Sequence, residues 1–231
     1  MGNYEKGVGH THPLFLFQKG CVVPETIPNM TGVLVAGGKS RRMGRDKRFL
    51  ELGGQTLLQR TLSVLQSLFA EVLVALAEPL PQLTGNGYRV VTDLIPNCAT
   101  LGGLYTGLAS AGHPRIFAVG CDMPFLNPET IKRLAGIGEQ VDIAMPKLAV
   151  GLQPMHAVYS KACLPHLEQM AKAQQLKVQA LAEGRGLTVK LVPEKDFLDV
   201  DPHLLSFFNI NTPADLEFAR KLLAGSGQDR A

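Results

Sequence analysis

The sequence lacks the cysteine patterns that build disulfide frameworks or zinc sites. Its four cysteines, Cys21, Cys98, Cys121 and Cys163, are widely separated and include no C-x-x-C pair. Cysteines with this spacing are typical of free thiols in a reducing compartment. We therefore expect a cytoplasmic protein whose thiols are free.

Long hydrophobic runs are also missing. A helix that crosses a bilayer needs about 20 apolar residues, and no stretch approaches that length, so we expect no membrane partner. The apolar patch from Leu14 to Phe17 is shorter than the ~7–15 residues of a secretory signal. Residues 1–29 differ in composition from the rest and are predicted to form a disordered tail. A single domain is expected over 30–226, with a second short tail at 227–231.

The chain has little excess charge of either sign. It carries 23 Lys and Arg against 20 Asp and Glu, a formal net charge of +3. A protein that binds nucleic acid presents a wider basic surface, so we expect no nucleic-acid partner. Several of the positive charges fall instead in one stretch, Thr31 to Lys47, which favours a local anion site.

Strand and helix patterns alternate along the chain. Short apolar runs predict strands, and apolar residues at helical spacing predict helices between them. This alternation predicts an α/β fold of three α/β/α layers, with a mostly parallel, Rossmann-like sheet covered by helices on both faces. The predicted strands are 33–35, 72–76, 88–91, 116–119, 141–145 and 187–192, and 153–159 is predicted to be a turn followed by a strand. The predicted helices are 56–69, 101–111, one that Asn127 caps, and 161–182 in two pieces. Residues 207–213 are predicted to be a strand entering a helix, with Thr212 as its N-cap.

The stretch from Thr31 to Lys47 reads T-G-V-L-V-A-G-G-K-S-R-R-M-G-R-D-K. A strand that leads into a glycine-rich basic loop is suited to phosphate, because backbone N–H groups and cations can both face the anion. A P-loop is excluded, since its first glycine would fall on Val33. A Rossmann fingerprint is excluded as well, because Gly37 and Gly38 are adjacent.

Two further polar groups follow predicted strands. Asp93 comes after the third strand, and Asp122 comes after the fourth, in Cys121-Asp122-Met123-Pro124. Ligands bind at the carboxyl ends of strands in open α/β sheets. A carboxylate there could hold Mg²⁺, which takes carboxylates, phosphates and water as ligands. The alternatives are that Asp122 caps a turn or helix and that Asp93 is an ordinary turn residue. His156 is expected to be packed or hydrogen-bonded rather than a metal ligand.

The ordered pattern L/V-A-G-G-x-S-x-R-M-G-x-D-K resembles the signature loop of nucleotidyltransferases that join an NTP to a phosphorylated acceptor. With A-G-G and a closing D-K, it is most similar to that of the molybdenum cofactor guanylyltransferases. The resemblance covers Thr31 to about Ala224. It rests on four segments: Val35 to Lys47, Thr92-Asp93, Cys121 to Pro124, and Asn209 to Pro213.

The resemblance implies a nucleotide-diphosphate-sugar transferase type of sheet. It also implies transfer of GMP from GTP to the terminal phosphate of molybdenum-molybdopterin, with release of pyrophosphate. Expected partners are GTP, molybdopterin or molybdenum-molybdopterin, molybdopterin-synthesis proteins and molybdoenzyme chaperones. Carried over by residue, GTP contacts are Val35, Ala36, Gly37, Lys47, Asp93 and Asp122, with Asp122 also binding Mg²⁺ and Asn209 and Asn211 on the molybdopterin side. Arg41 and Lys47 would neutralise the leaving pyrophosphate, so the catalytic candidates are Arg41, Lys47 and Asp122.

The sequence departs from the family pattern at two places. Ala75 stands where the second strand often ends in an Asn that contacts nucleotide. Ala99-Thr100-Leu101-Gly102-Gly103 stands where Gly-Pro-Leu-Ala-Gly is common. Both changes bear on base contacts, so a related enzyme that uses CTP or a sugar phosphate stays an alternative. A second alternative is a nucleotide-binding paralogue without catalysis, although the presence of Lys47 and Asp122 disfavours it.

Overall fold

The computed structural model describes residues 26–37, 46–81, 83, 85, 87–183 and 186–225. Residues 38–45 of the basic loop, with Arg41 among them, lie outside the described residues. The same holds for 1–25 of the predicted first tail and for 226–231 at the other end.

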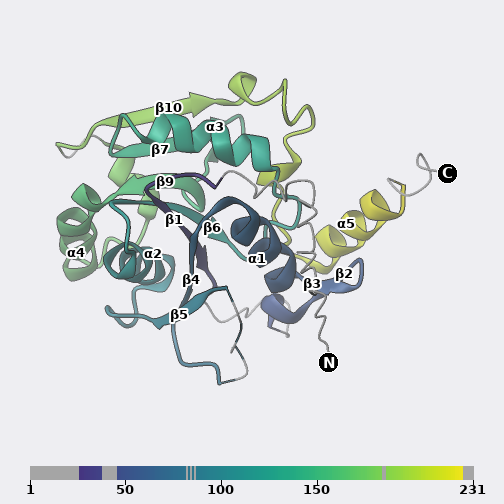
Figure 1. The fold of residues 1–231 in the computed structure, drawn as a ribbon, viewed down its shortest axis with the longest axis horizontal. Coiled ribbons are helices and arrows are strands. Elements are labelled where there is room, and N and C mark those ends of the chain that lie inside the picture. The colour runs from purple at the N-terminus through teal and green to yellow at the C-terminus, as the bar shows by residue number, and fades with distance from the viewer. Residues whose placement is uncertain are drawn as a thin grey trace, which may run out of the picture.

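In the described part of the chain, eight strands form one twisted sheet (Figure 1). Its order is β10-β7-β9-β6-β1-β4-β5, with β8 paired to β7. The pairs β1·β4, β1·β6, β4·β5 and β7·β10 are parallel, whereas β9 runs antiparallel to β6 and β7. The mostly parallel sheet that the sequence predicted is confirmed. The strands are β1 Met30–Val35, β4 Glu71–Leu76, β5 Arg89–Thr92, β6 Arg115–Gly120, β7 Ile143–Leu148, β8 Gly151–Leu152, β9 His156–Ser160 and β10 Val189–Pro193.

Helices cover both faces of the sheet and complete three layers. α1 (Leu57–Leu68) and α3 (Pro128–Gly138) pack on one face, and α2 (Ala99–Ser110) and α4 (Leu164–Lys172) pack on the other. Alternate side chains of β1 point to opposite faces of the sheet: Leu34 packs in the hydrophobic cluster under α1 and α3, and Val33 packs in the cluster under α2 and α4. This alternation follows from the two-residue period of a strand, and it makes β1 fully buried.

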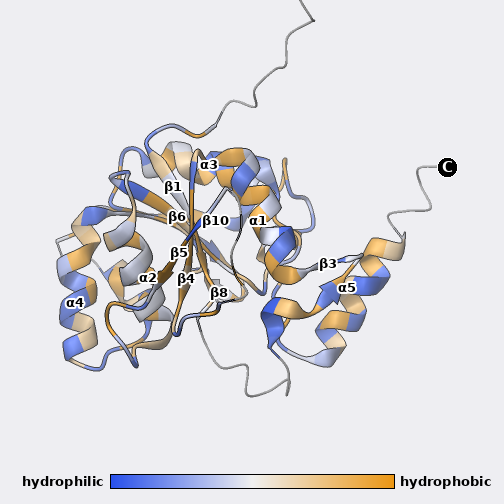
Figure 2. Cartoon of the chain, turned by 60° about the horizontal axis from the view of Figure 1, so that its bottom comes forward, coloured by the Kyte–Doolittle hydropathy of each residue, from blue (hydrophilic) through white to orange (hydrophobic). Residues whose placement is uncertain are grey.

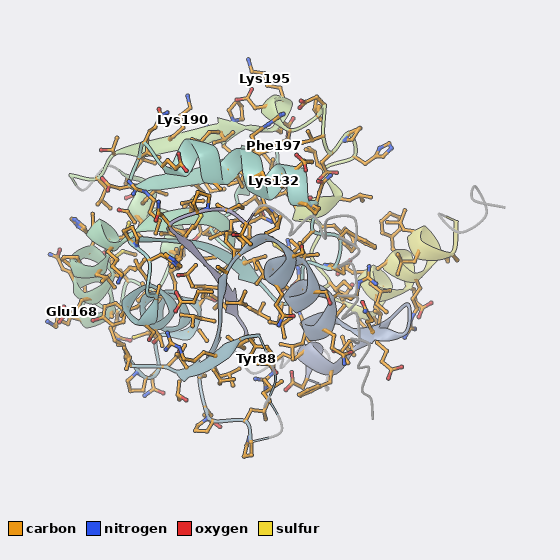
Figure 3. The ribbon with its side chains drawn as sticks, in the orientation of Figure 1. Tyr88, Lys132, Glu168, Lys190, Lys195 and Phe197 are labelled. Atoms are coloured by element: carbon orange, nitrogen blue, oxygen red, sulfur yellow. The ribbon has the colours of Figure 1, made fainter. Side chains whose placement is uncertain are left out.

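Colouring by hydropathy shows the same arrangement. The strands at the centre of the sheet are apolar, and the polar faces of the helices lie outside (Figure 2). Lys190 and Lys195 extend outward from the β10 edge, while Phe197 lies inside the fold and is fully buried (Figure 3). None of the helices within the described ranges is both long and apolar enough to cross a membrane.

Local sequence signals set the ends of several helices. Thr56 and Gln59 form a capping box at the start of α1, and Asn127 caps α3 with Pro128 in the first turn. Before α5 (Pro213–Gly225), the Thr212 hydroxyl accepts from the Asp215 N–H and the Asp215 carboxylate accepts from the Thr212 N–H. Each cap satisfies backbone donors that the helix leaves unpaired.

One expectation needs correction. Residues 207–213 do not contain a strand: the 3-10 helix η5 (Leu205–Phe207) is followed by irregular backbone. In this segment the N–H of Ile210 donates to the carbonyl of Asp122 at 2.8 Å and not to a neighbouring strand. The helical pieces predicted for 161–182 are present as α4 and the 3-10 helix η3 (Val178–Glu183), with the short 3-10 helix η2 (Lys161–Cys163) before α4.

The contacts of the domain begin before residue 30. The N–H of Ile27 donates to the carbonyl of Leu68 at 2.7 Å, and the Ile27 side chain packs against the cluster under α1. A chain that starts at Met30 would lose both interactions. The boundary predicted at residue 30 therefore stays a prediction, although the fold itself reaches back to Ile27.

Candidate functional site

The order of the strands creates a switch point between β1 and β6. The chain leaves β1 through α1 toward β4 on one side, and α2 then carries it back to β6 on the other side of β1. Val35 is paired in register with Ala75 and Gly120, so β1, β4 and β6 end at the same edge of the sheet. Ligands in open α/β sheets bind at such a point. Ala36 and Gly37 follow β1 here, and Cys121 and Asp122 follow β6.

Lys47, Asp122 and Asn211 meet at this edge, although they are far apart in the sequence. The ammonium of Lys47 donates to Oδ1 of Asn211 at 2.9 Å and lies 3.7 Å from Oδ2 of Asp122. Burial raises the pKa of Asp122, and the positive charge of Lys47 opposes that rise. The Asp122 side chain keeps 29% of its surface exposed, so the carboxylate remains accessible.

The backbone holds each member of this trio. Lys47 opens the 3-10 helix η1 (Lys47–Phe49), whose N-cap is Asp46. Asp122 follows β6 directly, and its carbonyl accepts from Ile210. The N–H of Asn211 donates to the Asp215 carboxylate at 2.8 Å. Asn209, the second residue expected on the acceptor side, donates instead from Nδ2 to the carbonyl of Phe207 at 3.0 Å.

Asp93 occupies the other end of the same edge. It follows β5, and its N–H donates to the carbonyl of Leu76 at 2.8 Å. β5 is three strands from β6, which places Asp93 roughly 14 Å from Asp122 at the usual strand spacing. The two carboxylates can therefore contact separate parts of one elongated ligand.

The surroundings of Asp93 leave its charge unsatisfied. Burial raises the pKa of Asp93 to about 6, and its buried Oδ1 has no hydrogen-bond partner within the described residues. α2 approaches closely because Gly102 has no side chain: a Cβ there would lie 3.1 Å from Oδ2 of Asp93. An unpaired buried oxygen is costly, so a ligand donor that reached Oδ1 of Asp93 would lower this cost.

The carboxylates at this edge determine which kind of metal site the described residues could form. Among the described residues, no group of three or more His, Cys, Asp and Glu side chains converges, so a cage made wholly of protein ligands is absent from that part of the chain. Mg²⁺ commonly binds through one or two carboxylates together with substrate phosphates and water. The accessible, partly desolvated carboxylate of Asp122 fits that mode, and a divalent ion would relieve the charge that burial disfavours.

His156 is a packed residue, as expected. Its ring contacts Phe117 edge-on, with centroids 5.1 Å apart, and lies 4.7 Å from the ring of Phe207. Burial lowers the pKa of His156 to about 3, so the imidazole is neutral. Neither ring nitrogen has a hydrogen-bond partner in the described part of the chain.

The cysteines bear out the expectation of free thiols where the structure describes them. Cys98, Cys121 and Cys163 are free, and Cys21 lies outside the described residues. Burial raises the pKa of both Cys121 and Cys163 to about 12, which keeps these thiols protonated. Cys121, although adjacent to Asp122, is therefore a packing residue rather than a nucleophile.

Sequence analysis did not single out Arg48. The Nη1 of its guanidinium donates to the carbonyl of Ala36, and the rest of the group binds Asp46. The available signal was its place directly after Asp46-Lys47. The sequence could not show that the side chain turns back to the end of β1.

The chain is similar to known proteins in both sequence and structure. The family model described as "MobA-like NTP transferase domain" matches residues 32–187. A protein of Pelotomaculum thermopropionicum named "Probable molybdenum cofactor guanylyltransferase" is 37% identical, over 87% of this chain and 96% of the relative. A "Molybdenum cofactor guanylyltransferase" of Desulfosudis oleivorans is 36% identical, over 82% of this chain and 94% of the relative.

A solved structure shares the fold. The crystal structure of "Molybdopterin-guanine dinucleotide biosynthesis protein A" from Archaeoglobus fulgidus superposes with a TM-score of 0.75 at 25% identity. The match covers 84% of this chain and 99% of that one. The three-layer architecture is therefore that of a nucleotidyltransferase.

Proposed function

Because the chain belongs to the family of MobA-like NTP transferase domains, we propose that it transfers GMP from GTP to the terminal phosphate of molybdopterin or molybdenum-molybdopterin, releasing pyrophosphate. The observation that carries the proposal is the position of Lys47. Its ammonium lies between the carboxylate of Asp122 and the side chain of Asn211. The names of the 36–37% identical relatives support the same reaction.

The reaction needs an acceptor oxygen to attack the α-phosphorus in line with the departing pyrophosphate. Negative charge builds on the phosphoryl oxygens and the leaving group, so the protein must supply positioned positive charge and N–H donors. Lys47 supplies a cation at the carboxyl end of β1. Gly37 has no side chain, so its backbone can approach a phosphate closely. The space beside it is narrow, since a Cβ there would lie 3.3 Å from the Ala77 nitrogen.

Asp122 would hold Mg²⁺ at this position. A divalent ion held there would supply positive charge for the phosphates of the nucleotide. Without a cation, the ionised Asp122 would repel phosphate oxygens. Lys47 reduces this repulsion through its contact at 3.7 Å.

The two ends of the site suit different parts of the reactants. Asp93, with an unpaired buried oxygen, is placed to accept a hydrogen bond from the nucleoside. Asn211 accepts a hydrogen bond from Lys47 and belongs to the segment expected on the acceptor side. Lys47 would therefore contact phosphate where nucleotide and acceptor meet.

The experiment is an assay of pyrophosphate release with Mg²⁺, offering each NTP in turn with molybdopterin or its molybdenum-loaded form. The proposal expects release that depends on both GTP and the acceptor. A preference for CTP would favour the related enzyme that Ala75 and Ala99 leave open. Nucleotide-dependent thermal stabilisation without pyrophosphate release from any NTP would contradict catalysis altogether.

A further inference from the structure

We propose that Arg48 is a positioning residue for nucleotidyl transfer, which fixes Lys47 opposite Asp122 by joining the end of β1 to the N-cap of η1. The inference rests on the transferase activity of the family and not on the choice of GTP. We infer that Arg48 acts through its neighbours, because each of its three guanidinium nitrogens donates to the protein itself.

The contacts of Arg48 form a fork. Nε donates to Oδ1 and Oδ2 of Asp46 at 2.9 and 3.0 Å, and Nη2 donates to Oδ2 at 2.5 Å. Nη1 reaches the carbonyl of Ala36 at 3.3 Å. The fork therefore links the first residue after β1 to the residue directly before Lys47.

The pair between Arg48 and Asp46 is bidentate and partly shielded from water. The Arg48 side chain is 18% exposed and that of Asp46 38%. Each charge stabilises the other: the guanidinium lowers the pKa of Asp46, and the carboxylate raises the pKa of Arg48. A planar guanidinium can form two hydrogen bonds to one carboxylate, which fixes the relative orientation of the two groups in addition to attracting them. The ring of Phe49 adds a cation–π contact at 5.8 Å.

The backbone of Lys47 is held by the contacts of its two neighbours, Asp46 and Arg48. Asp46 accepts from the N–H of Arg48 at 3.1 Å and so caps η1. With Asp46 fixed to Arg48 and Arg48 fixed to Ala36, the backbone of Lys47 is held at both sides. Its ammonium is then delivered to Asp122 and Asn211 with little freedom to lose on binding substrate. Preorganisation of this kind sustains electrostatic catalysis.

Two roles for Arg48, attraction of the triphosphate and positioning of Lys47, predict opposite effects of removing the charge of Asp46. If Arg48 served only to attract the triphosphate, Arg48→Lys would keep nucleotide binding, and removing the negative charge of Asp46 would strengthen it. If Arg48 positions Lys47, Arg48→Lys should lower activity, because an ammonium cannot make the forked contact with Asp46 and Ala36. Removal of the Asp46 charge then weakens the site, although Asn still caps η1.

The test compares Arg48→Lys, Arg48→Ala, Asp46→Asn and the Arg48→Ala/Asp46→Asn double variant, using the NTP that supports turnover in the wild type. We expect kcat/KM for the nucleotide to fall about 10–100-fold in each single variant. The loss of kcat/KM in the double variant should be no larger than in the worse single variant, because both substitutions remove the same Arg48–Asp46 contact.

Arg133→Lys is the matched control. Arg133 makes the same kind of contact, binding the Asp199 carboxylate with Nη1 and Nη2 at 2.5 and 2.7 Å and also the carbonyl of Asp196. It lies on α3, outside the site. We expect its kcat/KM to stay within about twofold of the wild type, a change worth under 0.5 kcal/mol on the usual tenfold scale.

Three results would overturn the proposal: wild-type kinetics in Arg48→Lys, tighter nucleotide binding in Asp46→Asn, or losses in the double variant that multiply. Nucleotide-induced shifts of the melting temperature provide a second readout that needs no turnover. A wild type that stabilises with NTP but releases no pyrophosphate would count against the proposed reaction. Undiminished shifts in Arg48→Lys would count against the positioning role.

Discussion

The ammonium nitrogen of Lys47 lies 3.7 Å from Oδ2 of Asp122. The two residues come from different strand ends, since Lys47 follows β1 and Asp122 follows β6. Burial raises the pKa of Asp122, and Lys47 is the nearby cation that opposes this effect. In the proposed reaction, Lys47 would be the cation for phosphate and Asp122 the carboxylate for a metal ion.

Replacement of Lys47 tests the first of these charges. In Lys47→Ala, phosphate charge is left unneutralised and Asn211 loses its donor. Loss of one such donor typically costs ~2.7–4 kcal/mol in the transition state, so kcat/KM for the nucleotide should fall by about two to three orders of magnitude. Lys132→Ala is the control, because its ion pair with Glu129 lies on the surface of α3. Unchanged kinetics in a folded Lys47→Ala protein would remove Lys47 from the site.

Asp93 predicts a pH dependence of stability. Its pKa in the fold, about 6, is above the ordinary value of 3.8, so the folded protein binds more protons than the unfolded chain between these values. The contribution of Asp93 to stability is therefore full below pH 3.8 and is lost as the pH rises through about 6. Carboxylates with lowered pKa, such as Glu71 and Asp142, act in the opposite direction at lower pH.

The measurement for Asp93 is the free energy of unfolding, without nucleotide, at pH 4.5 and pH 7. The difference between wild type and Asp93→Asn should grow in favour of the variant as the pH rises. A difference that is constant over this interval would show that Asp93 is not desolvated in the fold. Nucleotide should stabilise the variant less than the wild type if Asp93 accepts a hydrogen bond from it.

Ala99 provides a test of the local backbone. It begins α2 with φ of +47°, in the left-handed region that disfavours a Cβ. Ala99→Gly should stabilise the protein by about 0.5–1 kcal/mol. Ala109→Gly, within the same helix, should instead destabilise by about 1 kcal/mol. Urea unfolding measures both, and equal signs for the two changes would contradict the assignment of strain at Ala99.

The sequence predicted the parts of this structure that depend on local order. The apolar run that ends at Val35 and the one that ends at Val119 predicted β1 and β6, and glycine or aspartate after each run indicated the binding edge. Asn127 and Thr212 predicted helix starts, because a cap involves residues only a few positions apart.

Contacts between distant segments were beyond the same reasoning. Asn211 binds Lys47 across 164 positions, and no local pattern records that pairing. Residues 207–213 were predicted to include a strand, yet the N–H of Ile210 donates to the carbonyl of Asp122, and the Ile210 side chain packs with Leu52 and Leu216. The side chain of Arg48 is a similar case, since its partner Ala36 becomes close only when β1 is followed by the return through η1.

The central claim is that Asp122 anchors a metal ion, and Asp122→Asn tests it most directly through pyrophosphate release measured against Mg²⁺ concentration. Asn preserves the shape and removes a charge that burial disfavours, so the melting temperature should hold or rise. We predict that turnover collapses and that the residual activity needs more Mg²⁺. A folded Asp122→Asn protein with near wild-type turnover at low Mg²⁺ would contradict the account.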